Sequence, residues 1–267
     1  MFVELHIIQS FAPANLNRDD TNNPKDCEFG GVRRARISSQ CIKRAIRTCP
    51  TFAATTGIEP GLRTKRMIDR LREPLVAAGR QEGQVDAIVP AFVEAFASKL
   101  DRDGKRTAVL LYFSRAEMQG LAAALLENWD RLSDEKQRGA TAERIAKELV
   151  KQYKRRTSAP DIALFGRMLA EKPELNLDAA CQVAHAISTH RVTMEMDFYT
   201  AVDDLQPEDT AGAGMMGFTA YDSACFYRYT RLDWEQLVKN LDGDIPLARR
   251  TVEGFLRAAV EAVPTGK

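Results

Sequence analysis

The sequence predicts an α+β fold, in which strand-like segments near both ends enclose a long helical stretch. Residues 2–7 alternate apolar and polar side chains, and residues 61–157 read as almost entirely helical. After Asp161 the pattern returns to strands, followed by two amphipathic helices. The chain has 267 residues, enough for one large domain or two small ones. Its 45% hydrophobic and 28% charged residues are typical of a soluble globular protein.

The first elements follow from local signals. The alternation over residues 2–7 predicts a strand. Residues 10–32 are rich in Asn, Asp, Pro and Gly, and predict a loop. Ser38 or Ser39 can cap a helix that runs to about Thr48, which Pro50 closes.

The middle of the chain predicts an inserted helical lobe. A short strand is expected at 108–113, and the polar residues 133–140 predict a loop ending in Gly139. The expected helices cover residues 61–79, 84–100, 115–131 and 141–156.

The last third predicts strands, a long polar connection and helices. Residues 161–169 have a strand-like apolar core with Gly166 inside, and 179–188 have mixed helix and strand character. Residues 203–217 are acidic and then Gly-rich. The remaining expected elements are strands at 189–199 and 223–230, and helices at 233–241 and 246–262.

Positive charge is concentrated near the N-terminus. Residues 29–47 contain six Arg or Lys and no acid, although the formal net charge of the chain is only +1. Two glycines precede this run and a serine-capped helix lies within it. The pattern favours a phosphate chain as ligand over a small molecule.

Several classes of protein are not favoured. No window approaches 18 apolar residues, and the N-terminus lacks a signal peptide pattern. The five cysteines are odd in number, widely spaced and without a CxxC pair, which favours a reduced, cytoplasmic protein. No zinc-ligand spacing, P-loop, dinucleotide fingerprint or nucleophile elbow is present. We therefore expect no metal, no cofactor and no membrane association.

Ordered motifs along the chain resemble a known family. They are Leu16-Asn17-Arg18-Asp19-Asp20, Phe29-Gly30-Gly31, Arg36-Ile37-Ser38-Ser39-Gln40 with Lys43-Arg44, Asp161-Ile162-Ala163-Leu164 with Gly166-Arg167-Met168, Ala184 to His190, Phe198 to Leu205, and Phe226-Tyr227-Arg228-Tyr229. In this order they resemble the CasC family, the backbone subunit of the type I-E CRISPR Cascade surveillance complex of antiviral defence.

The resemblance implies a right-hand shape and a set of partners. A modified RRM-like (ferredoxin-like) palm is expected over 1–55 and 158–267, with helical fingers over 56–157 and a thumb hairpin at about 190–227. Copies are expected to stack as a helical filament along the guide RNA (crRNA) with other Cascade subunits. The chain itself is expected to be no enzyme, since guide–target pairing selects the target DNA.

The RNA contacts are expected at the basic helix and nearby. Amides after Ser38, the side chains of Ser39 and Gln40, and Lys43 and Arg47 suit phosphates, because a helix N-terminus offers free N–H groups and a positive dipole end. A solvated basic face with a simple cap is the plain alternative. The resemblance implies that Arg18 and Lys25 also contact RNA. The spacing alone would place Met168 in the core, whereas the resemblance implies that Met168, with Arg167, lies beside a displaced base.

Two further surfaces are expected to contact nucleic acid or a neighbouring subunit. A basic helix face is expected to contact target DNA, with an ordinary exposed helix as the alternative; its residues are Lys136, Arg138, Arg144, Lys147 and Lys151. The thumb is expected to wedge against bases or dock on a neighbour, with a long surface loop as the alternative; its residues are Phe198, Tyr199, Met215, Met216 and Phe218, around a flexible Gly212–Gly217 tip.

Two acidic pairs and two histidines could indicate a catalytic or metal-binding function instead of RNA binding alone. Asp19-Asp20 and Asp203-Asp204 could hold Mg²⁺, so a metal-dependent endoribonuclease of a related CRISPR effector is the runner-up, and a generic RNA chaperone the third reading. Adjacent strand residues point to opposite faces, so neither pair is automatically a shared site. Asp19 and Asp20 are expected instead to pair with Arg18 or neighbouring arginines, or to form a turn. His185 and His190 are expected to be buried and hydrogen-bonded.

The resemblance also carries one departure. The family's chain continues beyond the Val263–Lys267 region with a further strand. A C-terminally shortened palm is therefore expected, with an unfilled sheet edge that would invite pairing with another chain.

Overall fold

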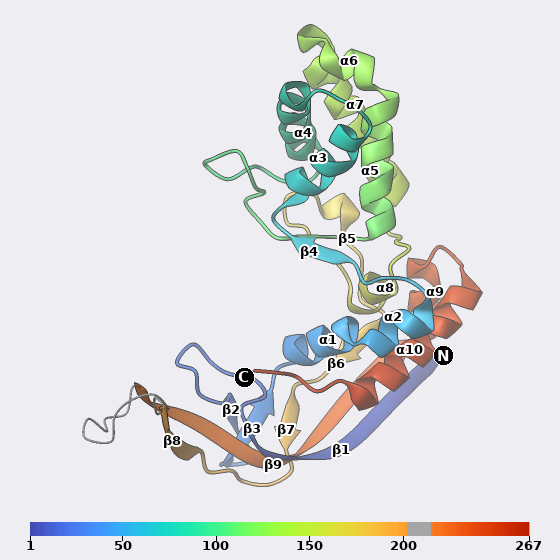
Figure 1. Ribbon diagram of the computed structural model, residues 1–267. Helices are drawn as coiled ribbons and strands as arrows, with labels where there is room; N and C mark the ends of the chain where they lie inside the picture. The colour runs from blue at the N-terminus through green and yellow to red at the C-terminus, as the bar shows by residue number, and fades with distance from the viewer. Residues whose placement is uncertain (202–214, 267) are drawn as a thin grey trace. The chain divides into compact units, whose positions relative to one another are not determined.

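The computed structural model describes residues 1–201 and 215–266 (Figure 1). These residues form two compact units. The sheet unit comprises residues 3–49, 182–231 and 255–267. The helical unit comprises residues 1–2, 50–181 and 232–254. Among the residues described, no helix combines the length and the apolar surface that crossing a membrane requires.

One seven-stranded sheet forms the body of the sheet unit. Its strands are β1 (Phe2–Ala14), β2 (Asp26–Phe29), β3 (Val32–Ile37), β6 (Cys181–Val183), β7 (Ala186–Ser188), β8 (Glu195–Ala201) and β9 (Met215–Asp233). The order is β1-β9-β7-β3-β2, and both β6 and β8 pair with β9. The pairs β2–β3, β3–β7, β7–β9 and β8–β9 are antiparallel.

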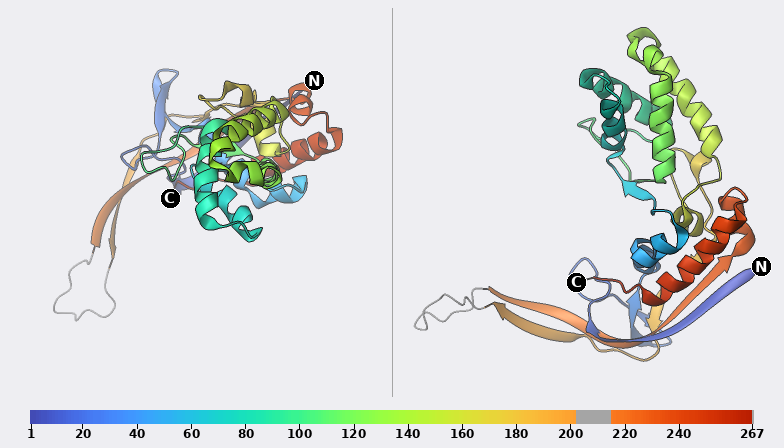
Figure 2. Two further views of the ribbon diagram at one scale, coloured as in Figure 1. Left: turned by 90° about the horizontal axis from the view of Figure 1, so that it is seen from above. Right: turned by 45° about the vertical axis from the view of Figure 1, so that its right-hand side comes forward.

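Helices cover one face of this sheet. α1 (Ser39–Thr48) and the C-terminal turns of α10 (Ile245–Glu261) lie on the same side of it (Figures 1 and 2). Ile7 of β1, Ile42 and Ile46 of α1, and Ala259 of α10 line one small space beneath them. Both isoleucines of α1 are fully buried. This face therefore holds the core of the sheet unit.

The N-terminal strand and the first helix are confirmed, but the loop between them is shorter than expected. β1 extends to Ala14, and β2 and β3 form a hairpin within the region predicted as loop at 10–32. Gly30 and Gly31 both have positive φ, 66° and 74°, which a two-residue hairpin turn requires. Because β2 is largely exposed, it lacks the apolar alternation that would have predicted it.

The helical unit contains the rest of the secondary structure. Its elements are α2 (Pro50–Thr56), β4 (Leu62–Thr64), α3 (Met67–Ala77), α4 (Glu82–Phe96), β5 (Leu111–Phe113), α5 (Arg115–Glu127), α6 (Trp129–Ser133), α7 (Glu135–Tyr153), α8 (Pro160–Phe165), the 3-10 turn η1 (Pro173–Leu175) and α9 (Trp234–Asn240). Its core includes Leu71, Phe92, Phe96 and Leu121, and the two phenylalanine rings stack at 5.6 Å. The predicted mixture of helices and strands is confirmed.

Four predicted elements of the chain are corrected. Residues 133–140 are no loop, because Asp134 caps α7 by accepting from the Lys136 amide. The expected helix at 61–79 begins with β4 and continues as α3. The strand expected at 161–169 is the helix α8, which Pro160 starts and Gly166 ends. The strand expected at 189–199 begins only at Glu195.

Candidate nucleic-acid interface

The N-terminus of α1 is built to receive an anion. Ser38 is the N-cap, and its hydroxyl accepts from the Cys41 amide at 3.3 Å. The Ser38 amide in turn donates to Oδ1 of Asn17 at 2.8 Å. No acidic side chain lies in the first turn, where Ser39 is half-buried and Gln40 exposed. The amides and dipole of this turn therefore favour phosphate binding.

The preceding loop is held against this turn by backbone hydrogen bonds. The Lys25 amide donates to the carbonyl of Asn17 at 2.8 Å, and the Arg36 amide donates to the carbonyl of Lys25 at 2.9 Å. Burial raises the pKa of the Cys41 thiol, and the charges of Lys25 and Arg44 oppose that rise. Lys25 thus lies close enough to α1 for its charge to affect the titration of the Cys41 thiol.

Arg18 lies on the same loop and is exposed. Its guanidinium donates to Oδ1 of Asn22 at 2.9 Å, which leaves further donors for a ligand. The structure therefore brings the loop cations Arg18 and Lys25 to the capped end of α1. This proximity is required if both residues are to bind the same RNA phosphates.

The basic run at 29–47 does not act as one patch. Arg33 pairs with Asp26, while Arg34 donates to the carbonyls of Phe29 and Ser188 at 3.0 and 2.8 Å. On α1, Lys43 and Arg47 are half-buried and both take part in interactions within the protein. Much of the charge in the β2–β3 hairpin is thus used within the protein.

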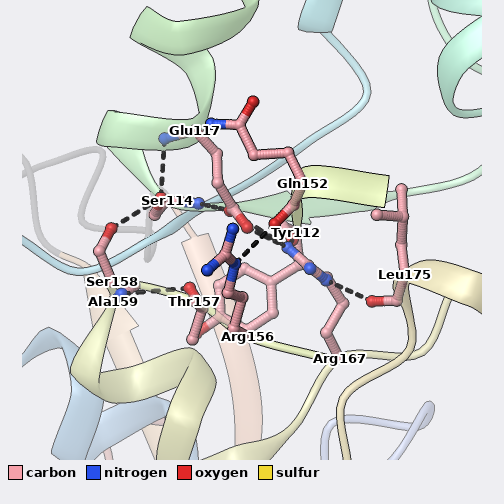
Figure 3. A network of polar contacts seen from close by, with 10 residues as sticks. All are labelled: Tyr112, Ser114, Glu117, Gln152, Arg156, Thr157, Ser158, Ala159, Arg167 and Leu175. Atoms are coloured by element: carbon pink, nitrogen blue, oxygen red, sulfur yellow. Dashed lines mark hydrogen bonds and ion pairs between the residues drawn. The ribbon is translucent and has the colours of Figure 1, made fainter. Parts of the chain in front are cut away.

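Arg167 has a structural role that the sequence did not indicate. Its side chain is fully buried, and its guanidinium donates to both carboxylate oxygens of Glu117, at 2.9 and 3.1 Å (Figure 3). It also donates to the carbonyl of Leu175 at 2.9 Å. Glu117 itself closes the capping box of α5 with Ser114. A side chain buried and paired in this way is not available to RNA, contrary to the expectation for Arg167.

Met168, the next residue, is exposed where Arg167 is buried. Its exposed fraction is 83%, far from the core position that a methionine usually takes. Gly166, with φ 78°, turns the chain, and the buried Arg167 fixes the residue beside it. A long apolar side chain is thus presented to solvent on a fixed backbone, as a contact beside a base would need.

Two of the five cations on the basic face of α7 form ion pairs with acids of the same helix. Arg144 donates to Glu148 at 2.9 Å, and Lys147 lies 3.8 Å from Glu143. Arg138 donates to the carbonyl of Leu132. Lys136 and Lys151 are exposed. The helix therefore offers less net charge to DNA than its sequence suggests.

A second cationic cluster appears only in three dimensions. The Thr107 amide donates to the carbonyl of Lys65 at 3.0 Å, which joins the β4 segment to the hairpin at residues 99–108. This contact gathers exposed cations, and none has an ion pair among the described residues. They are Arg63, Lys65, Arg66, Arg102, Lys105 and Arg106. Both basic runs, at residues 63–66 and 102–106, are visible in the sequence. Because they are far apart in the chain, the sequence does not show that they are close in space.

The expected thumb contains a two-stranded ladder with an aromatic surface. β8 pairs with β9 in the register Phe198 to Phe218, whose rings lie 5.2 Å apart. Phe198, Tyr199 and Phe218 are all exposed. Met215 and Met216 lie in β9 opposite Ala201 and Thr200. Of the expected Gly212–Gly217 tip, residues 215–217 belong to β9, whereas residues 212–214 and the pair Asp203-Asp204 lie outside the described residues.

Asp19 forms a turn within the loop. Its Oδ1 accepts from the amides of Thr21 and Asn23, both at 2.9 Å, and from the Thr21 hydroxyl at 2.8 Å. These hydrogen bonds, led by that of the Thr21 hydroxyl, lower the pKa of Asp19. Its carboxylate is therefore engaged in holding the loop that carries Arg18.

The two histidines are exposed, so their predicted burial is wrong. Both still have hydrogen-bond partners. Nδ1 of His185 lies 3.3 Å from a terminal nitrogen of Arg36, and Nε2 of His190 accepts from the Cys225 amide. His185 immediately precedes β7 and His190 follows it by two residues, so both lie outside the paired strand.

The chain is similar to proteins of known family and structure. Residues 3–267 match the family described as CT1975-like protein. A solved structure described as a CRISPR RNA-guided surveillance complex, pre-nicking, contains a chain with 35% identity and a TM-score of 0.86, over 100% of this chain and 74% of that one. A second, described as a CRISPR RNA-guided surveillance complex, gives 30% identity and a TM-score of 0.74, over 99% and 73%. No curated protein matches the chain.

Proposed function

Because the chain belongs to the CT1975-like protein family, we propose that it is a non-catalytic subunit that binds guide RNA in a CRISPR surveillance complex. The family match and the two structural matches confirm the resemblance to CasC. Beyond this, we propose that the complex is of type I-E, that it is cytoplasmic, and that copies of the chain line the guide.

One observation carries the proposal. The capped N-terminus of α1 is hydrogen-bonded to the loop that carries Arg18 and Lys25, which places cations beside free helix amides. Such a site binds phosphates and reads no bases, which is what a guide of any sequence requires. Repetition of a modest site along the RNA would supply avidity.

The two units differ from the expected palm and fingers, because the helical unit also takes in residues 158–181 and 232–254, which were expected in the palm. We propose that the sheet unit is an RRM-like palm, that β8 and β9 form the thumb, and that the helical unit contacts target DNA. The cluster of Arg63, Lys65 and Lys105 with its neighbours supports that last role better than α7, because its cations are unpaired among the described residues.

The test is to co-express the chain with a CRISPR array and its partner subunits, treat the purified material with RNase, and size the protected RNA. A long protected guide bound to several copies would support the proposal. A matched preparation with Gln40→Ala and Lys43→Ala should protect less RNA. Wild-type protein recovered without protected RNA would contradict guide binding.

A further inference from the structure

Aromatic rings gather on the sheet face that α1 and α10 leave open. Within the described residues, no helix of the sheet unit covers this second face (Figure 2). It holds a concavity of about 700 Å³, lined among others by His6 of β1, Phe29 of β2, and Tyr227 and Tyr229 of β9. The phosphate site at α1 makes no use of these rings.

The rings are organised by contacts with one another. The His6 ring centroid lies 5.0 Å from that of Tyr229 and 6.1 Å from that of Tyr227. Nδ1 of His6 is 2.7 Å from the Tyr227 hydroxyl, so a hydrogen bond fixes the pair. Tyr227 remains 43% exposed and Phe29 59% exposed. Preoriented, exposed rings of this kind are suited to stacking against a planar ligand.

One guanidinium and one carboxylate line the concavity. Arg34 uses two of its five donors on the carbonyls of Phe29 and Ser188, and its guanidinium lies 5.9 Å from the Phe29 ring centroid. Glu4 is the one carboxylate of the described lining, and it accepts from the Tyr229 hydroxyl at 2.9 Å. An aromatic floor with a guanidinium at its edge matches a ligand that is both planar and anionic.

We propose that this face is a stacking platform for bases of single-stranded RNA. His6 and Tyr227 form the floor, and Arg34 lies beside a phosphate. β3 carries Arg34 and leads directly to Ser38, so one strand connects the platform on the open face to the α1 site on the opposite face. It rests on the proposed RNA-binding function and adds a contact to bases, where the α1 site contacts phosphates.

The test compares two RNA single strands of equal length and charge, an oligouridylate and its abasic analogue, by fluorescence anisotropy with the purified full chain. Stacking predicts that wild-type protein prefers the base-bearing strand by about fivefold or more. Tyr227→Leu should remove that preference. Tyr227→Phe keeps the ring and should retain it, which also controls for folding.

Lys43→Ala separates this platform from the α1 site. It should weaken binding of both strands equally, because it removes a phosphate contact. If Lys43→Ala behaves in this way while Tyr227→Leu keeps the base preference, the platform is wrong and the RNA-binding function stands. If wild-type protein binds neither strand, the proposed function fails together with the platform.

A crosslinking experiment identifies the occupant directly. RNA that carries 5-iodouridine should crosslink, on irradiation, to the peptide that contains Tyr227. A photoreactive benzoylphenylalanine at position 227 should capture the same RNA. Capture of a second copy of the chain instead would make this face a protein interface and overturn the proposal.

Discussion

Lys43 tests the phosphate site at the scale of one residue. Lys43→Ala should weaken binding of unrelated RNAs to the same degree and lower the salt slope of binding by about 1, since one cation–phosphate contact is lost. Binding isotherms at several salt concentrations would measure both effects. Lys239→Ala, on α9, is a control of equal charge change. A loss that depends on RNA sequence would contradict backbone recognition.

Asp222 on β9 makes stability depend on pH. Its carboxyl is 8% exposed, and burial, with the charge of Asp26, raises its pKa to about 6. An unfolded carboxyl titrates near 4, so the folded state binds more protons between pH of about 4 and 6, and stability falls as pH rises through that window. Above pH of about 6, the ionised carboxylate of Asp222 lowers the free energy of unfolding by its full amount.

Asp222→Asn should therefore raise the free energy of unfolding at pH 7 by about 1–3 kcal/mol and flatten its pH dependence between about 4 and 6. Denaturant unfolding at a series of pH values measures this. Asp20→Asn, on the exposed loop, changes charge by the same amount and serves as the control. Unchanged pH dependence in Asp222→Asn would show that another group is responsible.

At the scale of elements, Gly166 ends α8 in a conformation that only glycine adopts easily. Its φ is 78° and its ψ is 170°, and an added Cβ would lie 2.8 Å from the Leu177 carbonyl oxygen. Gly166→Ala should cost about 2 kcal/mol or more, measured by thermal unfolding. Gly139→Ala, within α7 with open space around it, should instead stabilise by about 0.5–1 kcal/mol. Equal melting temperatures for the two variants would contradict this account.

The sequence predicts most elements whose signals are local. α1 was predicted with its cap and its end, because Ser38 and Pro50 act within one turn. β2 and α8 were missed, since an exposed strand has no apolar alternation and a short apolar helix resembles a buried strand. The role of Arg167 depends on Glu117, fifty residues away in the chain, and no local pattern reveals such a partner.

At the scale of the whole molecule, the proposed function separates assembly from cleavage. Asp19→Ala removes the acceptor that holds the loop of Arg18, so it should reduce the yield of protected RNA. It should not change any RNA cleavage by the assembled complex. Denaturing gels of incubated RNA would measure cleavage, with Asp20→Ala as the neighbouring control. Loss of a measured nuclease activity in Asp19→Ala would favour the metal-dependent endoribonuclease instead.

The exposure of Met168 has a chemical consequence. A thioether that is 83% exposed is open to oxidation by hydrogen peroxide, whereas Met67 and Met118 are buried and should resist it. A base lying against Met168 would shield its sulfur. If RNA binds as proposed, the fraction of sulfoxide at this position, read by mass spectrometry, would report how much of the protein is bound, and oxidation of Met168 would weaken that binding.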